Sequence, residues 1–416
     1  MENTEPQWLY NLRKKNWDLY NETPLPERAV HLWKYTEPAH FVLDGSEPVM
    51  THTQVLPPTV PDNSQPLESE YSGYSHKRPD SATRTAIEPA LAARGVIFKD
   101  LCMAAKENES LVARHLGRLI DHSMGKFEAL NSALWTSGLF LYVPDNVAIP
   151  KPIRLQRHTA GQNTFLRLLI LVGNNSEVTI IDDYAEENTQ RHTLVNSAVE
   201  IFVGESSRVN YAGIQRFSNM ITSYITQRSV IGRDSKSQSV FGALGGNISK
   251  ANVGTILDGR GAESKMSGVL FGNGTQHFDY HTLHHHKDDE SISDIDFKVI
   301  LKDKATSAYT GLIRINEDAL NCEAFQMNRN LLLNRGPKAE SIPELEILCD
   351  QVRCSHGATM GPIDPEMLFY LKSRGMSHDE AVKTVVSGFV EPTLGKLPAE
   401  LGKMFRAMVQ TRLEEH

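Results

Sequence analysis

The middle of the chain repeats a strand-forming pattern at a nearly constant interval, and this repeat limits the possible folds more than any other feature. From about residue 139 to residue 352, polar residues lead into β-branched and aromatic runs. Four such transitions lie near Ser176, Ser206, Ser235 and Ala262, at intervals of 30, 29 and 27 residues. No helical periodicity separates them, so the pattern favours a parallel β-helix in which each coil buries its apolar side chains against the next.

A β-sandwich is the alternative architecture. Its strands would return after about 8–12 residues through hairpin turns. The dipeptides Asp258-Gly259 and Asn273-Gly274 are typical of such turns. The longer interval favours the solenoid, but residue types alone leave both folds open.

The sequence before the repeat, residues 1–135, is of a different kind. Residues 57–85 hold several prolines among serines and acidic residues, so we expect a long loop there, because proline cannot sustain a helix or a central strand. Two helices should follow the loop. Asn108 can cap the first, and helical spacing places these apolar residues on the two helices: Leu111, Val112, Leu116, Leu119 and Ile120 on one, and Phe127, Leu130 and Leu134 on the other.

Helical signals return after residue 360. Asp364 precedes a proline at the first position of a helix, and Ser377 with Glu380 forms a capping box. A last helix carries one apolar face, made by Leu401, Met404, Phe405 and Met408. These faces either cap the solenoid or bind a partner, and the sequence leaves both interpretations open. We therefore divide the chain into a helical region (1–135), a β-helix core (136–360) and a C-terminal helical domain (361–416).

Composition excludes several classes of function. With 43 Lys and Arg against 51 Asp and Glu, the net charge is −8 and the pI is near 6.1, which disfavours binding to nucleic acid or anionic membranes. No apolar run is long enough to span a bilayer, and the N-terminal sequence does not resemble a signal peptide. Four cysteines are too few for a disulfide scaffold in a chain of 416 residues. We expect reduced thiols and a cytoplasmic protein.

The densest group of metal-binding side-chain types lies between His277 and Glu290. It includes His277, His281, His284 and His286 together with several carboxylates. Imidazole and carboxylate groups can hold a divalent metal ion, so a metal-dependent β-helix hydrolase or lyase is one hypothesis for this chain. The surrounding sequence predicts a strand, on which His284 and His286 share one side while His285 faces the other. The alternative is a polar face of the solenoid or a subunit contact.

A second candidate site lies near the end of the repeat. Cys354 and His356 are two residues apart, so on a strand both project to the same side, where a thiolate and an imidazole could bind iron or an iron-sulfur cluster. A buried cysteine and a structural histidine remain the alternative. The chain has no phosphate-binding loop, so we expect that it binds no nucleotide itself.

Several motifs from Asp303 to Phe389 resemble the SufB/SufD family of iron-sulfur cluster assembly proteins. They occur in the order and at the spacing of that family, and GVIFKDL and ALNSALWTSGLFLYVP extend the resemblance upstream to about residue 95. The motifs are GLIRINEDA, the Q-x-N-x-N-L-L-L run at Gln326–Leu333, PELEI, V-x-CSHGAT at Val352–Thr359, LFYLKSRG and EAVKTVVSGF.

The resemblance implies a right-handed parallel β-helix between helical domains, and a non-catalytic role in cluster assembly. It implies a SufB-like protomer bound through the β-helix, with a homodimer also possible, and a SufC-like ATPase bound through the C-terminal helices. Residues expected at the ATPase surface are Leu368, Phe369, Val385 and Phe389. The iron-sulfur cluster would be transient and shared with the SufB-like partner.

One position separates the two branches of the family. SufB-like sequences carry a cysteine where this chain has Met327, and a thioether cannot accept sulfur as a thiolate can. The chain therefore resembles SufD. Cys322 lies five residues earlier and should face the opposite side of the strand. The resemblance identifies His356 as the residue that helps to form the cluster, with Cys354 beside it.

Overall fold

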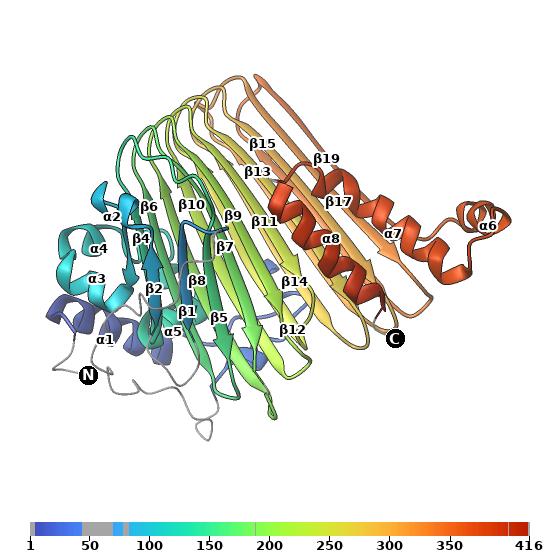
Figure 1. Ribbon diagram of the computed structural model, residues 1–416, viewed down its shortest axis with the longest axis horizontal. Coiled ribbons are helices and arrows are strands. Elements are labelled where there is room, and N and C mark those ends of the chain that lie inside the picture. The colour runs from blue at the N-terminus through green and yellow to red at the C-terminus, as the bar shows by residue number, and fades with distance from the viewer. Residues whose placement is uncertain (1–4, 44–69, 78–82, 188, 398, 415–416) are drawn as a thin grey trace.

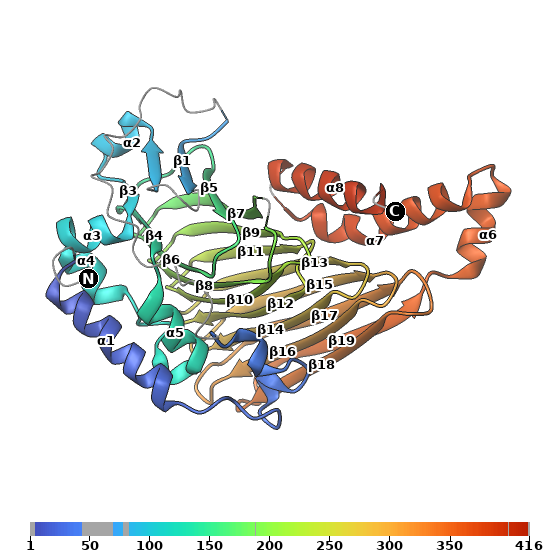
Figure 2. The same ribbon diagram turned by 90° about the horizontal axis from the view of Figure 1, so that it is seen from below.

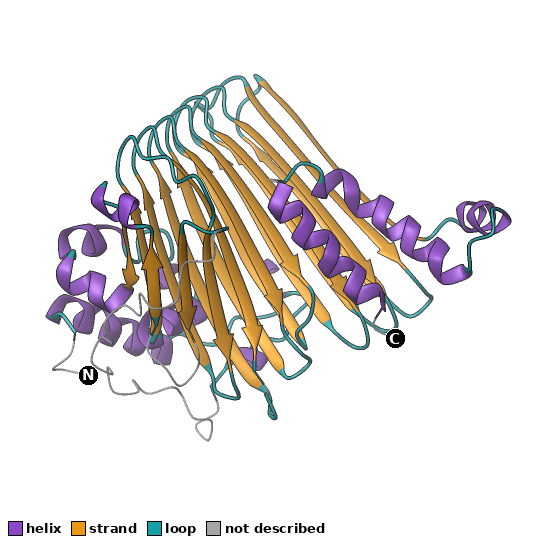
Figure 3. Ribbon diagram, viewed as in Figure 1, coloured by secondary structure: helices purple, strands orange, loops and turns teal. Residues whose placement is uncertain are grey.

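The computed structural model shows two parallel β-sheets wound face to face into a solenoid of about eight turns, with helices at both ends (Figures 1 and 3). The structure describes residues 5–43, 70–77, 83–187, 189–397 and 399–414. One sheet has ten strands in the order β19-β17-β15-β13-β11-β9-β7-β5-β1-β2, and the other has nine in the order β18-β16-β14-β12-β10-β8-β6-β4-β3. From β4 onward, successive strands therefore alternate between the sheets.

The strands of the ten-stranded sheet are, in chain order, β1 (Gly73–Lys77), β2 (Arg84–Ile87), β5 (Ile153–Thr159), β7 (Glu177–Glu186), β9 (Arg208–Arg216), β11 (Lys236–Ala243), β13 (Glu263–Gly272), β15 (Ile292–Leu301), β17 (Cys322–Leu332) and β19 (Val352–Pro362). Those of the nine-stranded sheet are β3 (Ile97–Asp100), β4 (Ser137–Val143), β6 (Thr164–Val172), β8 (Thr193–Val203), β10 (Ile221–Ile231), β12 (Ile248–Leu257), β14 (His277–His286), β16 (Thr306–Ile315) and β18 (Lys338–Ile347). The helices are α1 (Gln7–Glu22), α2 (Pro89–Ala93), α3 (Leu101–Glu107), α4 (Glu109–His115), α5 (Lys126–Leu134), α6 (Pro365–Ser373), α7 (His378–Leu394) and α8 (Ala399–Glu414), with short 3-10 turns η1 (His31–Trp33), η2 (Pro38–Phe41) and η3 (His122–Met124).

The predicted repeat is confirmed, and the sandwich is wrong. Strands β7, β9, β11 and β13 begin one or two residues after the four transitions found in the sequence, and each pairs in parallel with the next. The serines at these transitions stack on one another: Ser176 N–H donates to Ser207 Oγ at 3.0 Å, and Ser207 N–H donates to Ser235 Oγ at 3.0 Å. This ladder satisfies buried backbone groups at the corners of these coils, which explains why a serine directly precedes β7, β9 and β11.

The main core lies between the two sheets. Side chains alternate along each strand, so on β17 the even-numbered residues from Cys322 to Asn330 point inward and are buried, while the odd-numbered residues are partly exposed. Strand β6 is buried along its whole length because helices cover its outer face. Arg167, which interrupts this apolar strand, donates to the Glu200 carboxylate at 2.5 Å, and both side chains are fully buried.

The N-terminal end differs from the prediction in two places. Residues 73–77 lie inside the expected long loop but form β1, which pairs with β5 and β2. The proline-free stretch allows this pairing, and residues 57–69 and 78–82 lie outside the described residues. Helix α4 ends at His115, earlier than expected, and Asn108 makes no side-chain cap. The following backbone N–H groups of Gly117, Leu119 and Ile120 instead donate to Glu200.

The C-terminal end settles how the apolar helix faces are covered. Helices α7 and α8 lie across the outer face of the ten-stranded sheet (Figure 1). They bury Val386, Val390, Leu394, Leu401 and Phe405 against outward-facing residues of the sheet, among them Ile214, Val240, Val269 and Ile300. Of the two interpretations that the sequence left open, the structure favours the one in which the solenoid covers the apolar faces of α7 and α8. Both predicted caps are confirmed: Asp364 accepts from Glu366 N–H, and Ser377 with Glu380 forms the capping box.

Replacing Phe405 by alanine should release the α7–α8 hairpin from the sheet. The ring is fully buried and lies against Gly242, where an added Cβ would come within 2.5 Å of the ring. Loss of a buried phenylalanine side chain typically costs about 3–5 kcal/mol. We expect faster tryptic cleavage within residues 364–414 while the solenoid stays intact, measured by mass spectrometry of timed digests. Gln410→Ala, on the exposed side of α8, is the matched control, and equal cleavage rates in the two variants would contradict this account.

Candidate functional site

The solenoid is open at its C-terminal end. Strands β18 and β19 are the last strands of their sheets, and no described strand pairs with their outer edges. Figure 2 shows both strands at the margin of the solenoid, at the far end from α1. The inward side chains of this last coil are partly exposed, whereas the same positions on the preceding coil are buried. An uncovered edge of ten or eleven residues in each sheet presents unpaired backbone N–H and C=O groups.

Both candidate residues from the CSHGAT motif lie on the open edge strand. The register pairs Ala324 with Cys354 and Gln326 with His356, so the two side chains point into the interior of the last coil. The His356 side chain is exposed because no further coil covers it. Cys354 packs against the edge of the main core, and burial together with the Cys322 thiol raises the pKa of Cys354. In this uncovered state Cys354 is a neutral thiol and a weak nucleophile.

Met327 and Cys322 lie on opposite sides of β17, as the sequence predicts. Met327 faces outward, and its Sδ would lie 3.0 Å from a Cβ added at the paired residue Gly357. Cys322 faces inward, is completely buried, and lies 3.2 Å from Ser291 Oγ. Burial raises the pKa of Cys322. Its thiol therefore lies inside the solenoid, away from the outward face that carries Met327.

The coil beneath His356 has a polar interior that the sequence analysis did not single out. Gln326, Asn328 and Asn330 are all buried and inward-facing. Gln326 Nε2 donates to the Gly311 carbonyl of the opposite sheet at 3.2 Å, and Asn330 Nδ2 donates to Asn328 Oδ1 at 2.7 Å. The alternating amides are visible in the Q-x-N-x-N motif, but their position beneath His356 depends on the register between β17 and β19.

The predicted metal-binding histidines do not form one site. His284 and His286 face the interior from β14 and are completely buried. His284 Nε2 lies 3.0 Å from Ser264 Oγ, and the two ring nitrogens of His286 lie 2.7 and 2.8 Å from Ser291 Oγ and Ser293 Oγ. Burial lowers the pKa of His284 to about 3 and that of His286 to about 4, so both rings are neutral at pH 7.

His277 and His281 face the opposite side of β14, beneath an N-terminal segment that we call the strap, residues 31–41. His277 Nε2 lies 2.9 Å from Thr36 Oγ1, and His281 Nε2 lies 2.9 Å from Asp279 Oδ1. Lys250 Nζ donates to Asp279 Oδ2 at 2.6 Å and to the Leu32 carbonyl at 2.5 Å.

The charges beneath the strap neutralise one another. Burial alone would raise the pKa of the Asp279 carboxyl, but the Lys250 ammonium and the His281 ring outweigh it and hold that pKa well below its usual range. The Asp279 carboxylate therefore forms an ion pair with the Lys250 ammonium, which also donates a hydrogen bond to the strap at Leu32. Among the described residues, no group of three or more His, Cys, Asp or Glu side chains is arranged to hold a metal ion.

The four residues expected at the ATPase surface differ in their exposure. Phe369 on α6 is 75% exposed, and its neighbours Met367 and Tyr370 are 48% and 56% exposed. Leu368 and Val385 are half-buried. Phe389 on α7 packs against the cluster beneath the hairpin, and its carbonyl accepts a hydrogen bond from Lys298. Helix α6 thus carries an exposed apolar surface, whereas Phe389 contacts the solenoid.

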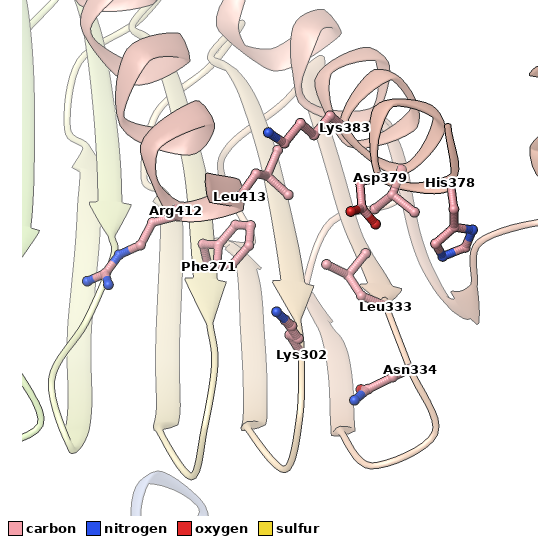
Figure 4. Close-up of a pocket in the computed structure, with 10 residues that line it drawn as sticks. Phe271, Lys302, Leu333, Asn334, His378, Asp379, Lys383, Arg412 and Leu413 are labelled. Atoms are coloured by element: carbon pink, nitrogen blue, oxygen red, sulfur yellow. The ribbon is translucent and has the colours of Figure 1, made fainter. Parts of the chain in front are cut away.

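A cavity of about 230 Å³ lies between the α7–α8 hairpin and the ends of the strands beneath it (Figure 4). Lys302, Lys383 and Arg412 line it together with Asp379 and an apolar floor that includes Phe271. None of the residues predicted from the sequence lines this cavity.

No described helix is both long and apolar enough to cross a membrane.

Two family models match the chain. Residues 155–389 match the SufBD core domain of the SUF system for FeS cluster assembly, and residues 79–155 match the SufBD protein N-terminal region. Curated relatives described as iron-sulfur cluster assembly SufBD family proteins include those of Staphylococcus saprophyticus and Staphylococcus aureus strain MRSA252. Each is 27% identical over 421 aligned positions, which cover 99% of this chain and 90% of the relative. The matches agree with the resemblance drawn from the motifs.

The buried histidines should make the stability of the protein depend on pH. Unfolded histidine titrates near pH 6.5, whereas folded His284 does so at about 3. As the pH falls below about 6.5 the unfolded chain gains a proton that the folded chain does not, and the free energy of unfolding drops by about 1.4 kcal/mol per pH unit for each such histidine. His284→Gln should weaken this dependence between pH 6.5 and 4.5, measured by urea denaturation. His192→Gln, at an exposed histidine, should retain the wild-type dependence.

Proposed function

Because the chain belongs to the SufBD family of iron-sulfur cluster assembly proteins, we propose that it is a SufD-like, non-catalytic subunit of a SufB/SufC/SufD scaffold. One observation carries the proposal: His356 is exposed on β19, the last strand of its sheet at the C-terminal end of the described solenoid. A binding site that includes His356 would be complete only when a second chain covers this edge and adds its own groups.

The second chain is a SufB-like protomer, with a second copy of this chain as the other possibility. Its own edge strands would pair with β18 and β19, because exposed edges of this length favour addition of a further strand. Pairing would also cover exposed apolar residues of the last coil, including Met360. The seam between the two solenoids then encloses His356.

In this proposal an iron-sulfur cluster is assembled between the two solenoids and is then passed on, so it is not a permanent cofactor of the chain. A neutral imidazole is a good iron ligand, and a single histidine from this chain leaves the remaining positions to groups from the partner. Cys354 is close enough along the strand to contribute once it is deprotonated, although its raised pKa favours the thiol. Met327 supports the SufD-like role, because the thioether cannot carry a persulfide. Such chemistry needs reduced thiols, so the proposed assembly would work in the cytoplasm.

Helix α6 is the proposed docking surface for a SufC-like ATPase. It projects beyond the body of the protein in Figures 1 and 2 and carries large exposed apolar side chains, with Phe369 the most exposed. The hairpin that follows α6 is packed on the solenoid, so a movement of α6 driven by a partner's nucleotide cycle would be transmitted to the sheet that ends in β19. The chain itself would then bind no nucleotide.

The hydrolase or lyase hypothesis is not favoured. His284 and His286 are enclosed between the sheets, and His277 and His281 contact Thr36 and Asp279 beneath the strap. These contacts give each histidine a structural partner.

Replacing His356 by alanine should lower cluster formation in the assembled complex by tenfold or more, since even changes to groups that only support a metal ligand typically cost about 10–100-fold. The measurement is the rate of appearance of cluster absorbance during anaerobic reconstitution. His378→Ala, at an exposed histidine on α7, is the matched control. Unchanged reconstitution in the His356→Ala complex would remove this residue from the mechanism.

Replacing Phe369 by alanine should weaken binding of the SufC-like ATPase by about 30-fold, the effect expected for an aromatic residue at the centre of an interface. Calorimetric titration of the purified chain with the ATPase measures it. Trp17→Ala provides the comparison, because Trp17 is a 40% exposed aromatic residue on α1 at the other end of the molecule. Equal affinities for both variants would show that α6 is not the docking surface.

A further inference from the structure

A buried acceptor with no partner lies directly beneath His356. Gln326 is 2% exposed, and its Oε1 atom makes no hydrogen bond. Its other amide atom, Nε2, donates to the Gly311 carbonyl, so the orientation of the amide is set: the donor faces the opposite sheet and the acceptor is left over. A buried polar atom without a partner is costly and uncommon in folded proteins, so this oxygen calls for an explanation.

The stacking of the coils leaves one direction for a partner. On the preceding coil the residue in register with Gln326 is Ile295, whose side chain offers no hydrogen bond. On the following coil it is His356. Side chains in register on neighbouring parallel strands are about 4.8 Å apart at their Cα atoms and point the same way, so an imidazole nitrogen can reach Oε1 by side-chain rotation.

We propose that Gln326 is a positioning residue for His356. When a partner strand covers β19, one ring N–H of His356 donates to Gln326 Oε1, and this bond selects a single tautomer. The other ring nitrogen then carries a lone pair directed to the seam, where it can bind iron. This inference rests on the proposed function, and it adds which group orients the ligand and which end of the Gln326 amide does so.

Gln326 can orient His356 because the two ring nitrogens of a neutral imidazole have different hydrogen-bonding roles. A neutral ring has one donor nitrogen and one acceptor nitrogen, and the group bonded to the donor decides which nitrogen is left to bind a metal. Metal-binding histidines are usually held in this way by an acceptor behind the ring. In the uncovered chain His356 is exposed to water, so either nitrogen can carry the proton. Covering the edge removes water and leaves Gln326 Oε1 as the acceptor behind the ring.

The test is the tautomer of His356, read from the ¹⁵N chemical shifts of its ring in the assembled complex with ¹⁵N-histidine-labelled protein. We expect one tautomer in the wild type and a mixture in Gln326→Leu, which keeps the side-chain volume but removes the acceptor. Asn330→Leu is the matched control, because Asn330 is also a buried inward amide on β17 with an unpartnered oxygen, Oδ1, but its register partner is Met360. This control should keep the single tautomer.

Cluster formation supplies the second readout. Gln326→Leu should slow it about 10–100-fold while Asn330→Leu leaves it near the wild-type rate. If Gln326→Leu fails to fold by circular dichroism, Gln326→Met keeps the unbranched chain and carries the same test. An unchanged tautomer in the folded variant would overturn the inference. Loss of the single tautomer in a complex where His356→Ala still assembles clusters normally would instead uphold the positioning contact and overturn the proposed function.

Discussion

Each coil of this protein is completed by the next, and that dependence governs the rest of the structure. In a parallel ladder every strand needs a neighbour on both sides to satisfy its backbone groups and to cover its inward side chains. A stack of coils must nevertheless end twice. At the first end β2 pairs antiparallel with β1, β3 pairs antiparallel with β4, and helices pack beside them. At the second end β18 and β19 stay uncovered, and there the exposed histidine lies.

The same stacking explains why polar residues inside the chain are poor guides to function. A side chain that enters the interior or lies beneath the strap must find a partner one coil away, as Glu200 does with Arg167 and Asp279 with Lys250. Such pairs do not by themselves indicate catalysis, because removing one member leaves a buried charge unpaired and the fold alone requires both. The histidine-rich run of β14 belongs to this structural class. Gln326 Oε1 is of another kind, because it is buried without a hydrogen-bond partner and is in register with an exposed histidine on the last coil.

The C-terminal helices all carry apolar residues in the sequence, but these residues have different surroundings in the structure. The apolar faces of α7 and α8 hold them to the ten-stranded sheet, and α6 presents its large side chains to solvent. An attached hairpin gives α6 a firm base, so a force applied to α6 reaches the strands below. This arrangement joins the proposed docking surface on α6 to the ten-stranded sheet through the packed α7–α8 hairpin.

The sequence by itself predicted the repeat, favoured the solenoid over the sandwich, and predicted the Asp364 and Ser377 caps and the opposite sides of Met327 and Cys322, because these follow from local periodicity and backbone capping. It also identified the family through motifs that are contiguous in the chain. It missed β1 inside the proline-rich stretch and the early end of α4, and it left open what covers α7 and α8, because each depends on contacts between distant segments. Only the tertiary structure decided that His356 is uncovered and that Gln326 lies beneath it, since residues 30 apart become neighbours only when one coil is placed on another.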